Sequence, residues 1–450
     1  MTTDTLRVLA KARLAAPAGA ALFCLALQLW AARFVVVAFD TPNASTAIAR
    51  NLAATGGYAC TACEGVLHGS GAYARNTPLL MFQLPGEPLF IAACLRYIPA
   101  GGLRYIHVPF TVLLVFAAAY VALKLYGPVV AALTGFVAAL QPFVLLHGPV
   151  WDDTFFGAAL EWSVFALLLA ALDDKRGGPV LWRRPLRVTL IAALAGYASI
   201  TRSSSQLLLL AVAAAIFIVK PLRSIRLEAF GAIAGMALAL GAWGYRNYGV
   251  LGQFTFGSSH DGITLWESVY PSAREAILTR GQTERLNEDR MQDDFARTSA
   301  MNEVEANRYF VNRAVRYMIA KPADVIHTGL VKIPLALLGL ELREPVSSTR
   351  NLVGSLSSSV LILLAACGAF AVRLRAERPQ RLLWRCVAVS CLLTYAGLTF
   401  IGGIGLRYRI SLEPVFWILA AACLTRAVEG LWNGRPCASP AAQHEVFLPQ

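Results

Sequence analysis

The chain carries little charge for its length. Only 15% of its 450 residues are Asp, Glu, Lys or Arg, whereas a soluble domain carries roughly 25%. Hydrophobic residues make up 57% of the chain and gather in long runs that leave few polar stretches. This shortage of charge argues against an ordinary soluble enzyme and indicates a protein whose helices lie mostly in lipid.

Other features are also missing. We find no internal repeat and no low-complexity tract. The first hydrophobic run lacks a clear small-residue cleavage site, which favours a retained membrane anchor over a cleaved signal peptide. The runs are continuous, which argues against a membrane β-barrel with its short alternating segments. A zinc site at Cys60 and Cys63 would need two further ligands, and only His68 is near. The sequence therefore does not predict a zinc site here; no cofactor is predicted, and a divalent cation is left as an open alternative.

Apolar runs that approach the length of a membrane-crossing helix recur along the chain. The stronger runs are 16–38, 107–123, 128–147, 154–172, 228–245, 352–372, 386–404 and 411–429, and the weaker ones are 79–98, 188–201, 205–219 and 325–342. They predict an all-α membrane protein with about 10 to 13 crossings. In 79–98, Glu87 lies between two prolines, so this run crosses, re-enters or lies along the membrane. The run 325–342 is a full span or a half-span.

The net charge of +13 is explained by basic loops between the apolar runs. There are four clusters of basic residues, which begin at Arg7, Lys175, Lys220 and Arg373 and extend to Arg13, Arg187, Arg226 and Arg385. Cytoplasmic loops of membrane proteins carry such an excess of Lys and Arg. We therefore place all four clusters in the cytoplasm, with the lipid bilayer as the partner of the chain, and no binding of nucleic acid is needed to account for the charge.

Two long polar segments are predicted to lie outside, at 39–78 and 249–324. We predict one membrane-embedded domain over 1–432, with these segments as its external loops, and a disordered cytoplasmic tail over 433–450. The first loop contains Cys60 and Cys63, which would form a disulfide in an oxidising compartment. In the second loop, residues 303–320 form an amphipathic helix that lies among lipid headgroups or packs on its own subdomain.

Four short patches carry residues of the types that act in catalysis and binding. They are Phe39-Asp40-Thr41-Pro42 with the later Gly56-Gly57-Tyr58; Trp151-Asp152-Asp153-Thr154; Trp243-Gly244-Tyr245-Arg246-Asn247-Tyr248; and Arg407-Tyr408-Arg409 with Leu412-Glu413-Pro414. A further pattern runs from Gly196 to Thr201-Arg202, between two short apolar runs. Carboxylates thus stand at some predicted membrane exits and arginines at others.

The order and spacing of these patches, over residues 20–425, resemble the GT-C class of integral-membrane glycosyltransferases. The resemblance is closest to the bacterial branch that includes protein O-mannosyltransferases and the lipid A aminoarabinose transferase. Two positions depart from the pattern: many members carry Glu where this chain has Thr41, and a proline where it has Ser203. The first departure weakens any mechanism that needs two carboxylates at the first site.

The resemblance implies an inverting transfer of a sugar from a polyprenyl-phosphate donor to a hydroxyl of a glycan, lipid or protein, on the periplasmic face of the inner membrane. It implies that Asp40 is the general base, although an Asp before Thr-Pro is also typical of a helix N-cap. Asp152 and Asp153 would orient the acceptor, assist the base or bind a divalent cation; they would equally well cap a helix.

Four arginines are candidates for the donor phosphate, because the guanidinium fork matches phosphate oxygens. They are Arg246, Arg407, Arg409 and Arg202. The alternative for each is an ordinary interfacial charge. Tyr58 and Glu87 are weaker candidates for contact with substrate. The competing function is a transporter or flippase of lipid-linked sugars, which the lack of a repeat disfavours.

Overall fold

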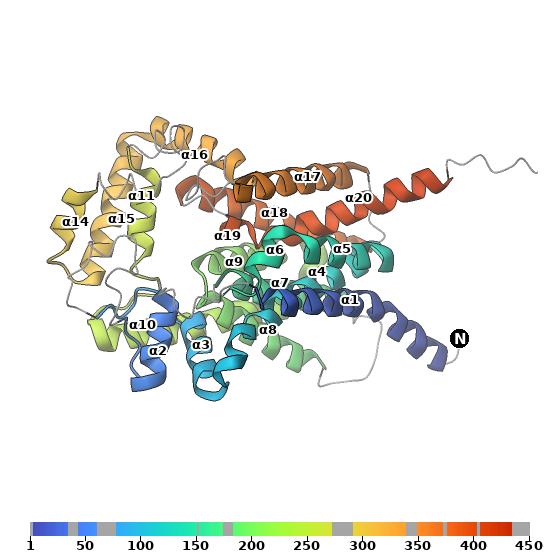
Figure 1. The fold of residues 1–450 in the computed structure, drawn as a ribbon, viewed down its shortest axis with the longest axis horizontal. Coiled ribbons are helices and arrows are strands. Elements are labelled where there is room, and N and C mark those ends of the chain that lie inside the picture. The colour runs from blue at the N-terminus through green and yellow to red at the C-terminus, as the bar shows by residue number, and fades with distance from the viewer. Residues whose placement is uncertain are drawn as a thin grey trace, which may run out of the picture.

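The computed structural model describes most of the chain (Figure 1). The described residues are 3–34, 44–60, 78–150, 153–173, 183–271, 291–338, 349–371, 376–402 and 406–433. Asp40, Asp152, Cys63 and the predicted tail 433–450, apart from its first residue, lie outside these ranges. Side chains are not described at several helix ends, Arg407 among them.

The described residues are almost entirely helical, which confirms the predicted all-α class. The elements are α1 (Thr3–Ala31), α2 (Ala44–Thr55), α3 (Gly86–Tyr97), η2 (Ala100–Tyr105), α4 (Val108–Tyr126), α5 (Pro128–Leu140), α6 (Pro142–His147), α7 (Asp153–Asp173), α8 (Arg183–Ser199), α9 (Ser203–Ile218), η4 (Lys220–Ile225), α10 (Arg226–Leu251), α11 (Asp261–Val269), α14 (Gln292–Thr298), α15 (Glu303–Ala320), α16 (Pro322–Leu337), α17 (Thr349–Ala371), α18 (Arg378–Ile401), α19 (Leu406–Arg409) and α20 (Glu413–Asn433). Within these ranges, β-type backbone pairing is limited to one isolated antiparallel bridge between Cys60 and Leu79.

Six helical stretches in the described residues are long and apolar enough to cross a membrane. They are Leu14–Ala31, Ala100–Tyr126, Asp153–Asp173, Lys220–Leu251, Leu352–Phe370 and Arg378–Ile401, and α5 and α9 are shorter apolar helices. The chain is therefore a multi-pass membrane protein. Within the described residues, this criterion of length and composition gives fewer crossings than the 10 to 13 predicted for the whole chain. One reason is that the run 128–147 divides at Pro142, which has no N–H to continue α5. Another is that the run 79–98 contains a helix of only 12 residues, α3.

Helix α7 is the centre of the membrane bundle. Inside the protein, 83% of its apolar window is buried, against 28% for α1. It packs on α4, α8, α9 and α18, while α4 packs on α1 and α5 (Figure 1). Helices α8 and α10 approach closely because a glycine, Gly235, lies against the carbonyl of Ala192, where a Cβ would come within 1.9 Å. Small residues permit such backbone contact between membrane helices.

A small subdomain lies at one end of this bundle, and α11, α14 and α15 form it (Figure 1). Its apolar core includes Ile263, Trp266, Phe295 and Phe310. The amphipathic helix predicted over 303–320 is α15, and it packs its apolar side on α11. Of the two alternatives for this helix, the structure shows the one in which it packs on its own subdomain.

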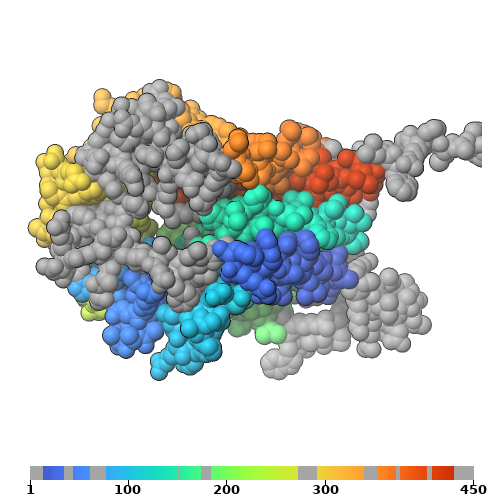
Figure 2. All heavy atoms as spheres, viewed as in Figure 1, coloured from blue at the N-terminus to red at the C-terminus, as the bar shows by residue number. Residues whose placement is uncertain are grey.

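The two ends of the bundle differ in charge. At the end away from the subdomain, which we call the basic end, Arg381 and Arg385 are exposed on α18 and Lys124 pairs with Asp173. At the subdomain end, α7 begins with Asp153. The space-filling view shows α1 (dark blue) and α5 (teal) side by side between these ends (Figure 2). Because α7 connects both ends, its first residue lies at the end of the bundle where the subdomain is.

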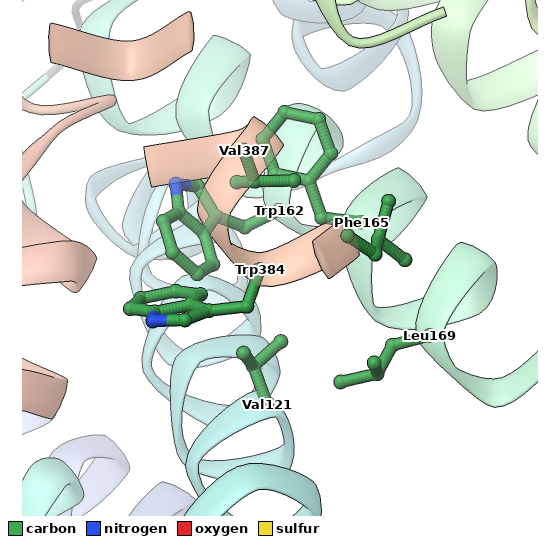
Figure 3. A pocket seen from close by; sticks show the side chains of 7 residues that line it. Val121, Trp162, Phe165, Leu169, Trp384 and Val387 are labelled. Atoms are coloured by element: carbon green, nitrogen blue, oxygen red, sulfur yellow. The ribbon is translucent and has the colours of Figure 1, made fainter. Parts of the chain in front are cut away.

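An apolar gap lies between α4, α7 and α18, in the half of the bundle nearer the basic end (Figure 3). Its volume is about 10 Å³, and its lining is entirely apolar: Val121, Trp162, Phe165, Leu169, Leu383, Trp384 and Val387. The rings of Trp162 and Trp384 meet edge to face at 6.5 Å. The indole N–H of Trp162 donates to the carbonyl of Ser411. The gap is therefore a packing defect with no polar group to hold a charged ligand.

Filling this gap should stabilise the protein. Val387→Ile adds one methylene to the wall, and burying a methylene contributes about 0.8 kcal/mol. As a matched control, Ala118→Val on α4 adds volume at a fully buried position outside the gap and should cost about 1–3 kcal/mol. Thermal unfolding of the purified proteins in one detergent measures both. If Val387→Ile lowers the melting temperature as much as the control does, the gap does not accept a methyl group.

Candidate active site

A segment that is non-helical up to Pro85 and ends at the first residue of α3, residues 79–86, lies where the subdomain meets the bundle. Backbone groups in such a segment must be paired because water does not reach them freely. The guanidinium of Arg246 donates to the carbonyl of Leu80 at 2.6 Å. The carboxylate of Glu303 accepts from the N–H groups of Leu80 at 2.7 Å and Met81 at 3.1 Å. Arg246, on α10, thus pairs with a carbonyl group of this short stretch of backbone, and Glu303, on α15, pairs with its N–H groups.

Further partners complete this pairing. The hydroxyl of Tyr58 donates to the carbonyl of Gln83 at 2.9 Å, and that of Tyr197 to the carbonyl of Gly86 at 2.8 Å. The N–H of Gly86 donates to the carbonyl of Ile200 at 2.7 Å. At the start of the segment, Leu79 pairs with Cys60, which is disulfide-bonded to a partner outside the described residues. The segment therefore joins four parts of the chain.

Arg246 and Tyr58, both predicted to contact substrate, lie together. The guanidinium of Arg246 lies over the rings of both Tyr58 and Trp243, at 5.2 Å and 5.0 Å from their centres. It also donates to the carbonyl of Tyr58 at 2.8 Å and to the side chain of Asn247 at 2.9 Å. Burial raises the pKa of the Tyr58 hydroxyl, and Arg246 opposes this shift only in part. Tyr58 is therefore a neutral hydrogen-bond donor.

Arg202 and Asp153 form a second pair of predicted residues. Asp153 is the first residue of α7, and Arg202 is the extended residue that precedes α9. Arg202 Nε lies 3.5 Å from Asp153 Oδ2, with the arginine side chain 6% exposed and the aspartate 36% exposed. The stem of Arg202 crosses α7 at Gly157, where a Cβ would come within 2.7 Å of Arg202 Cδ. The absence of a side chain at Gly157 thus makes room for this arginine.

Glu87 lies behind this pair, in a buried position. Its carboxylate is 3.8 Å from Nε2 of His107, and Phe90 packs against the same histidine. The preceding residue, Gly86, is in close contact with Thr201, next to Arg202. Asp261, on the subdomain helix α11, lies close to the residue that follows Arg202, since Ser203 Oγ is 3.5 Å from Asp261 Oδ2. Glu87, predicted to contact substrate, is therefore close to the Arg202 turn but enclosed by protein.

The remaining predicted residues are placed differently. Arg409 is fully buried in the bundle, where it donates to Glu413, to the carbonyl of Leu337 and to Ser358. No contact between Arg409 and Asp153 or Arg246 is found among the described residues. Asp40, Asp152 and the side chain of Arg407 lie outside the described part, so their convergence with Arg246 stays a prediction.

Sequence reasoning missed three residues of this region. Glu303 and Asp261 follow no motif, and their contacts depend on chain segments far apart in sequence. Glu161, fully buried on α7, had a usable signal, because a carboxylate inside an apolar run is unusual. In the described part of the chain, no group of three or more His, Cys, Asp or Glu could hold a metal ion.

Comparison with solved structures identifies the fold. The chain is similar to the archaeal oligosaccharyltransferase AglB from Archaeoglobus fulgidus in complex with an inhibitory peptide and a dolichol-phosphate: the TM-score is 0.53 and the identity 12%, over 97% of this chain and 52% of that one. The oligosaccharyltransferase of the same organism tethered with an acceptor peptide gives a TM-score of 0.54 at 13% identity, over 93% and 50%. The chain has the fold of GT-C membrane glycosyltransferases. It spans about half the length of these oligosaccharyltransferases.

Another solved structure is matched by this chain over a larger share of its length. ArnT from Cupriavidus metallidurans, bound to undecaprenyl phosphate, is similar over 95% of this chain and 79% of that one, at 14% identity and a TM-score of 0.37. No family model matches the chain, and no curated protein matches it.

The contact between Gly157 and Arg202 can be tested by adding one methyl group. Gly157→Ala should push the arginine stem off α7 and lower the free energy of unfolding by about 1–3 kcal/mol. Gly241→Ala is the matched control, since no atom lies within 4 Å of a Cβ at this position of α10, and it should stabilise the helix by about 0.5–1 kcal/mol. Thermal unfolding compares them, and equal effects would show that Arg202 does not depend on Gly157.

Glu303 should make stability depend on pH. Burial raises the pKa of its carboxyl above the ordinary value of 4.5. A raised pKa means that the folded protein binds this proton more tightly, so the stabilisation is complete below about pH 4.5 and is lost as pH rises through the folded pKa. The stability of the wild type relative to Glu303→Gln should therefore fall as pH rises from about 4.5 toward neutral, by at most about 1.4 kcal/mol per pH unit. Melting curves across this range measure the difference, and parallel curves would contradict it.

Proposed function

We propose that this protein is a glycosyltransferase that moves a sugar from a polyprenyl-phosphate donor to a hydroxyl acceptor. The observation that supports it best is the pairing of Asp153 with Arg202 where the central helix of a GT-C fold meets the subdomain. The oligosaccharyltransferase of similar fold was solved with a dolichol-phosphate, which makes a lipid phosphate the natural ligand to test. We place the reaction on the extracytoplasmic side of the inner membrane, because the basic end then faces the cytoplasm.

Arg202 is our first choice for the donor phosphate. Its guanidinium faces a partly exposed carboxylate, and a phosphate can replace that carboxylate with matching geometry. Arg246 donates to the backbone of Tyr58 and Leu80, so we assign it the support of the adjacent wall and any phosphate contact only in addition. Arg409 binds groups inside the bundle, and Arg407 completes the predicted set.

Asp40 is the proposed general base. Its carboxylate takes the proton of the acceptor hydroxyl while the acceptor oxygen bonds to the anomeric carbon from the face opposite the phosphate. The bond between that carbon and the phosphate oxygen breaks, and the polyprenyl phosphate leaves with the negative charge that an arginine stabilises. The product is inverted at the anomeric carbon. Asp152 and Asp153 orient the acceptor, and Tyr58 and Glu87 shape the surrounding wall.

The base can be tested directly. Asp40→Asn keeps the size and the capping ability of the side chain but removes its basicity. It should abolish transfer, while Asp173→Asn at the basic end should not. The measurement is release of polyprenyl phosphate from synthetic polyprenyl-phosphate sugars in liposomes that contain each purified protein. Near-normal turnover by Asp40→Asn would show that Asp40 only caps a helix. Mass spectrometry of envelope glycans from cells with and without the intact gene identifies the natural acceptor.

A further inference from the structure

The link between α9 and α10 carries a group of exposed cations. Arg202, which precedes α9, pairs with Asp153 at the subdomain end of the bundle, so the last residues of α9 and the short helix η4 lie at the basic end. Three exposed basic side chains follow one another there: Lys220 and Arg223 on η4, and Arg226 at the start of α10. We call these three residues the α9–α10 patch.

The charges of the patch are held in place without being neutralised. The guanidinium of Arg226 donates to the carbonyl of Phe217 at 2.6 Å. The guanidinium of Arg223 donates to the carbonyl of Lys220 at 3.3 Å. Carbonyl groups at the end of a helix carry only partial negative charge. Among the described residues, no carboxylate forms an ion pair with any member of the patch, so its positive charge is open to an outside anion.

The acid closest in sequence does not cancel this charge. Glu228 is the one acidic residue of the sequence from 183 to 230. It is buried, and two arginines of α8 lie at the same carboxylate oxygen, Arg187 Nη2 at 3.0 Å and Arg184 Nε at 3.4 Å. Arg184 also donates to the carbonyl of Ser224, on η4, at 3.4 Å. Two guanidinium groups on one carboxylate leave a positive charge in excess, and it lies beside η4.

Apolar side chains are exposed directly beside these cations. Ile218, at the end of α9, is 77% exposed, and Phe230, on α10, is 60% exposed. Phe217 and Leu227 are exposed as well. The membrane-crossing stretch Lys220–Leu251 begins in the patch, so the apolar side chains face lipid tails while the charged groups reach the head groups. The patch therefore lies at the boundary between the two.

We infer that the α9–α10 patch binds an anionic phospholipid of the membrane leaflet at the basic end. Guanidinium groups match the oxygens of its phosphodiester, and basic groups at a membrane surface attract anionic head groups. The exposed apolar side chains of α9 and α10 contact its acyl chains, which selects a lipid over a free phosphate. The site lies at the opposite end of the bundle from Arg202, and the inference does not rest on the proposed function.

The test uses the purified full-length protein in a neutral detergent. Native mass spectrometry measures binding of phosphatidylglycerol, which is anionic, and of phosphatidylcholine with the same acyl chains, which is zwitterionic. The wild type should bind phosphatidylglycerol more tightly. The triple variant Lys220→Gln, Arg223→Gln and Arg226→Gln should bind it on the order of 100-fold more weakly, about fivefold for each basic residue. Binding of phosphatidylcholine should not change.

A matched control removes three exposed cations from the subdomain end, by Arg308→Gln, Arg316→Gln and Lys321→Gln together. It changes the net charge by the same amount and should leave the binding of both lipids unchanged. An equal loss in the two triple variants would show that affinity follows the net charge of the protein, which would overturn the inference. If the patch variant does not fold, Arg226→Gln alone tests the inference, with an expected loss of about fivefold.

Two further measurements locate and identify the ligand. Glycerophosphoglycerol, the same phosphodiester without acyl chains, should not displace the bound lipid; displacement as strong as that by phosphatidylglycerol itself would make the patch a site for free phosphate esters. Arg202→Gln should bind phosphatidylglycerol as the wild type does, and a loss in this variant would place the lipid at the other end of the bundle. Either of these results, or a wild type that does not distinguish the two lipids, overturns the inference and leaves the proposed function untouched.

Discussion

The structure depends on one requirement: the backbone of residues 79–86 must find hydrogen-bond partners at the edge of an apolar bundle. A helix would pair these groups within itself, but the prolines around Glu87 prevent helix formation before Gly86. Side chains do the pairing instead, and Arg246, Glu303, Tyr58 and Tyr197 reach the segment from different parts of the chain. Each unpaired group would cost about 1–3 kcal/mol, so the subdomain, the first loop and the bundle are held to one another through this segment.

The same requirement explains how charge is distributed in the bundle. Arg409 pairs with Glu413, Arg187 with Glu228 and Arg202 with Asp153. Removing one member of a buried pair strands the other, and this costs more than the pair contributes. The first two pairs are closed off by protein on the carboxylate side. The Arg202 pair is different from these two, because its carboxylate is partly exposed, and for this reason we propose its arginine for contact with an outside anion.

Sequence patterns predicted the elements of the fold well where the pattern was local. The run 154–172 forms α7, and the apolar stripe over 303–320 forms α15. A helix buried on all sides has a continuous apolar sequence, and a helix buried on one side has apolar residues at helical spacing. Pro142 lies within an apolar run, and its break of the helix was missed because the residues around it stay apolar. Asp153 and Arg202 were both candidates, but their pairing depends on how α7 and α9 pack. Glu303 was missed for the same reason, since its partners on the 79–86 segment lie more than 200 residues away.

The close contact of α8 with α10 has a mechanical consequence. At Gly235 the two backbones touch, and Arg246 lies 11 residues further along the same helix, about 16 Å away at 1.5 Å per residue. Gly235 is thus a fulcrum and the outer half of α10 is a lever arm. A tilt of about 4° at the fulcrum would move the guanidinium by about 1 Å, enough to disturb its hydrogen bonds with the wall. The position of Arg246 at the 79–86 segment is therefore set by the packing of α8 against α10 at Gly235, a residue that has no side chain.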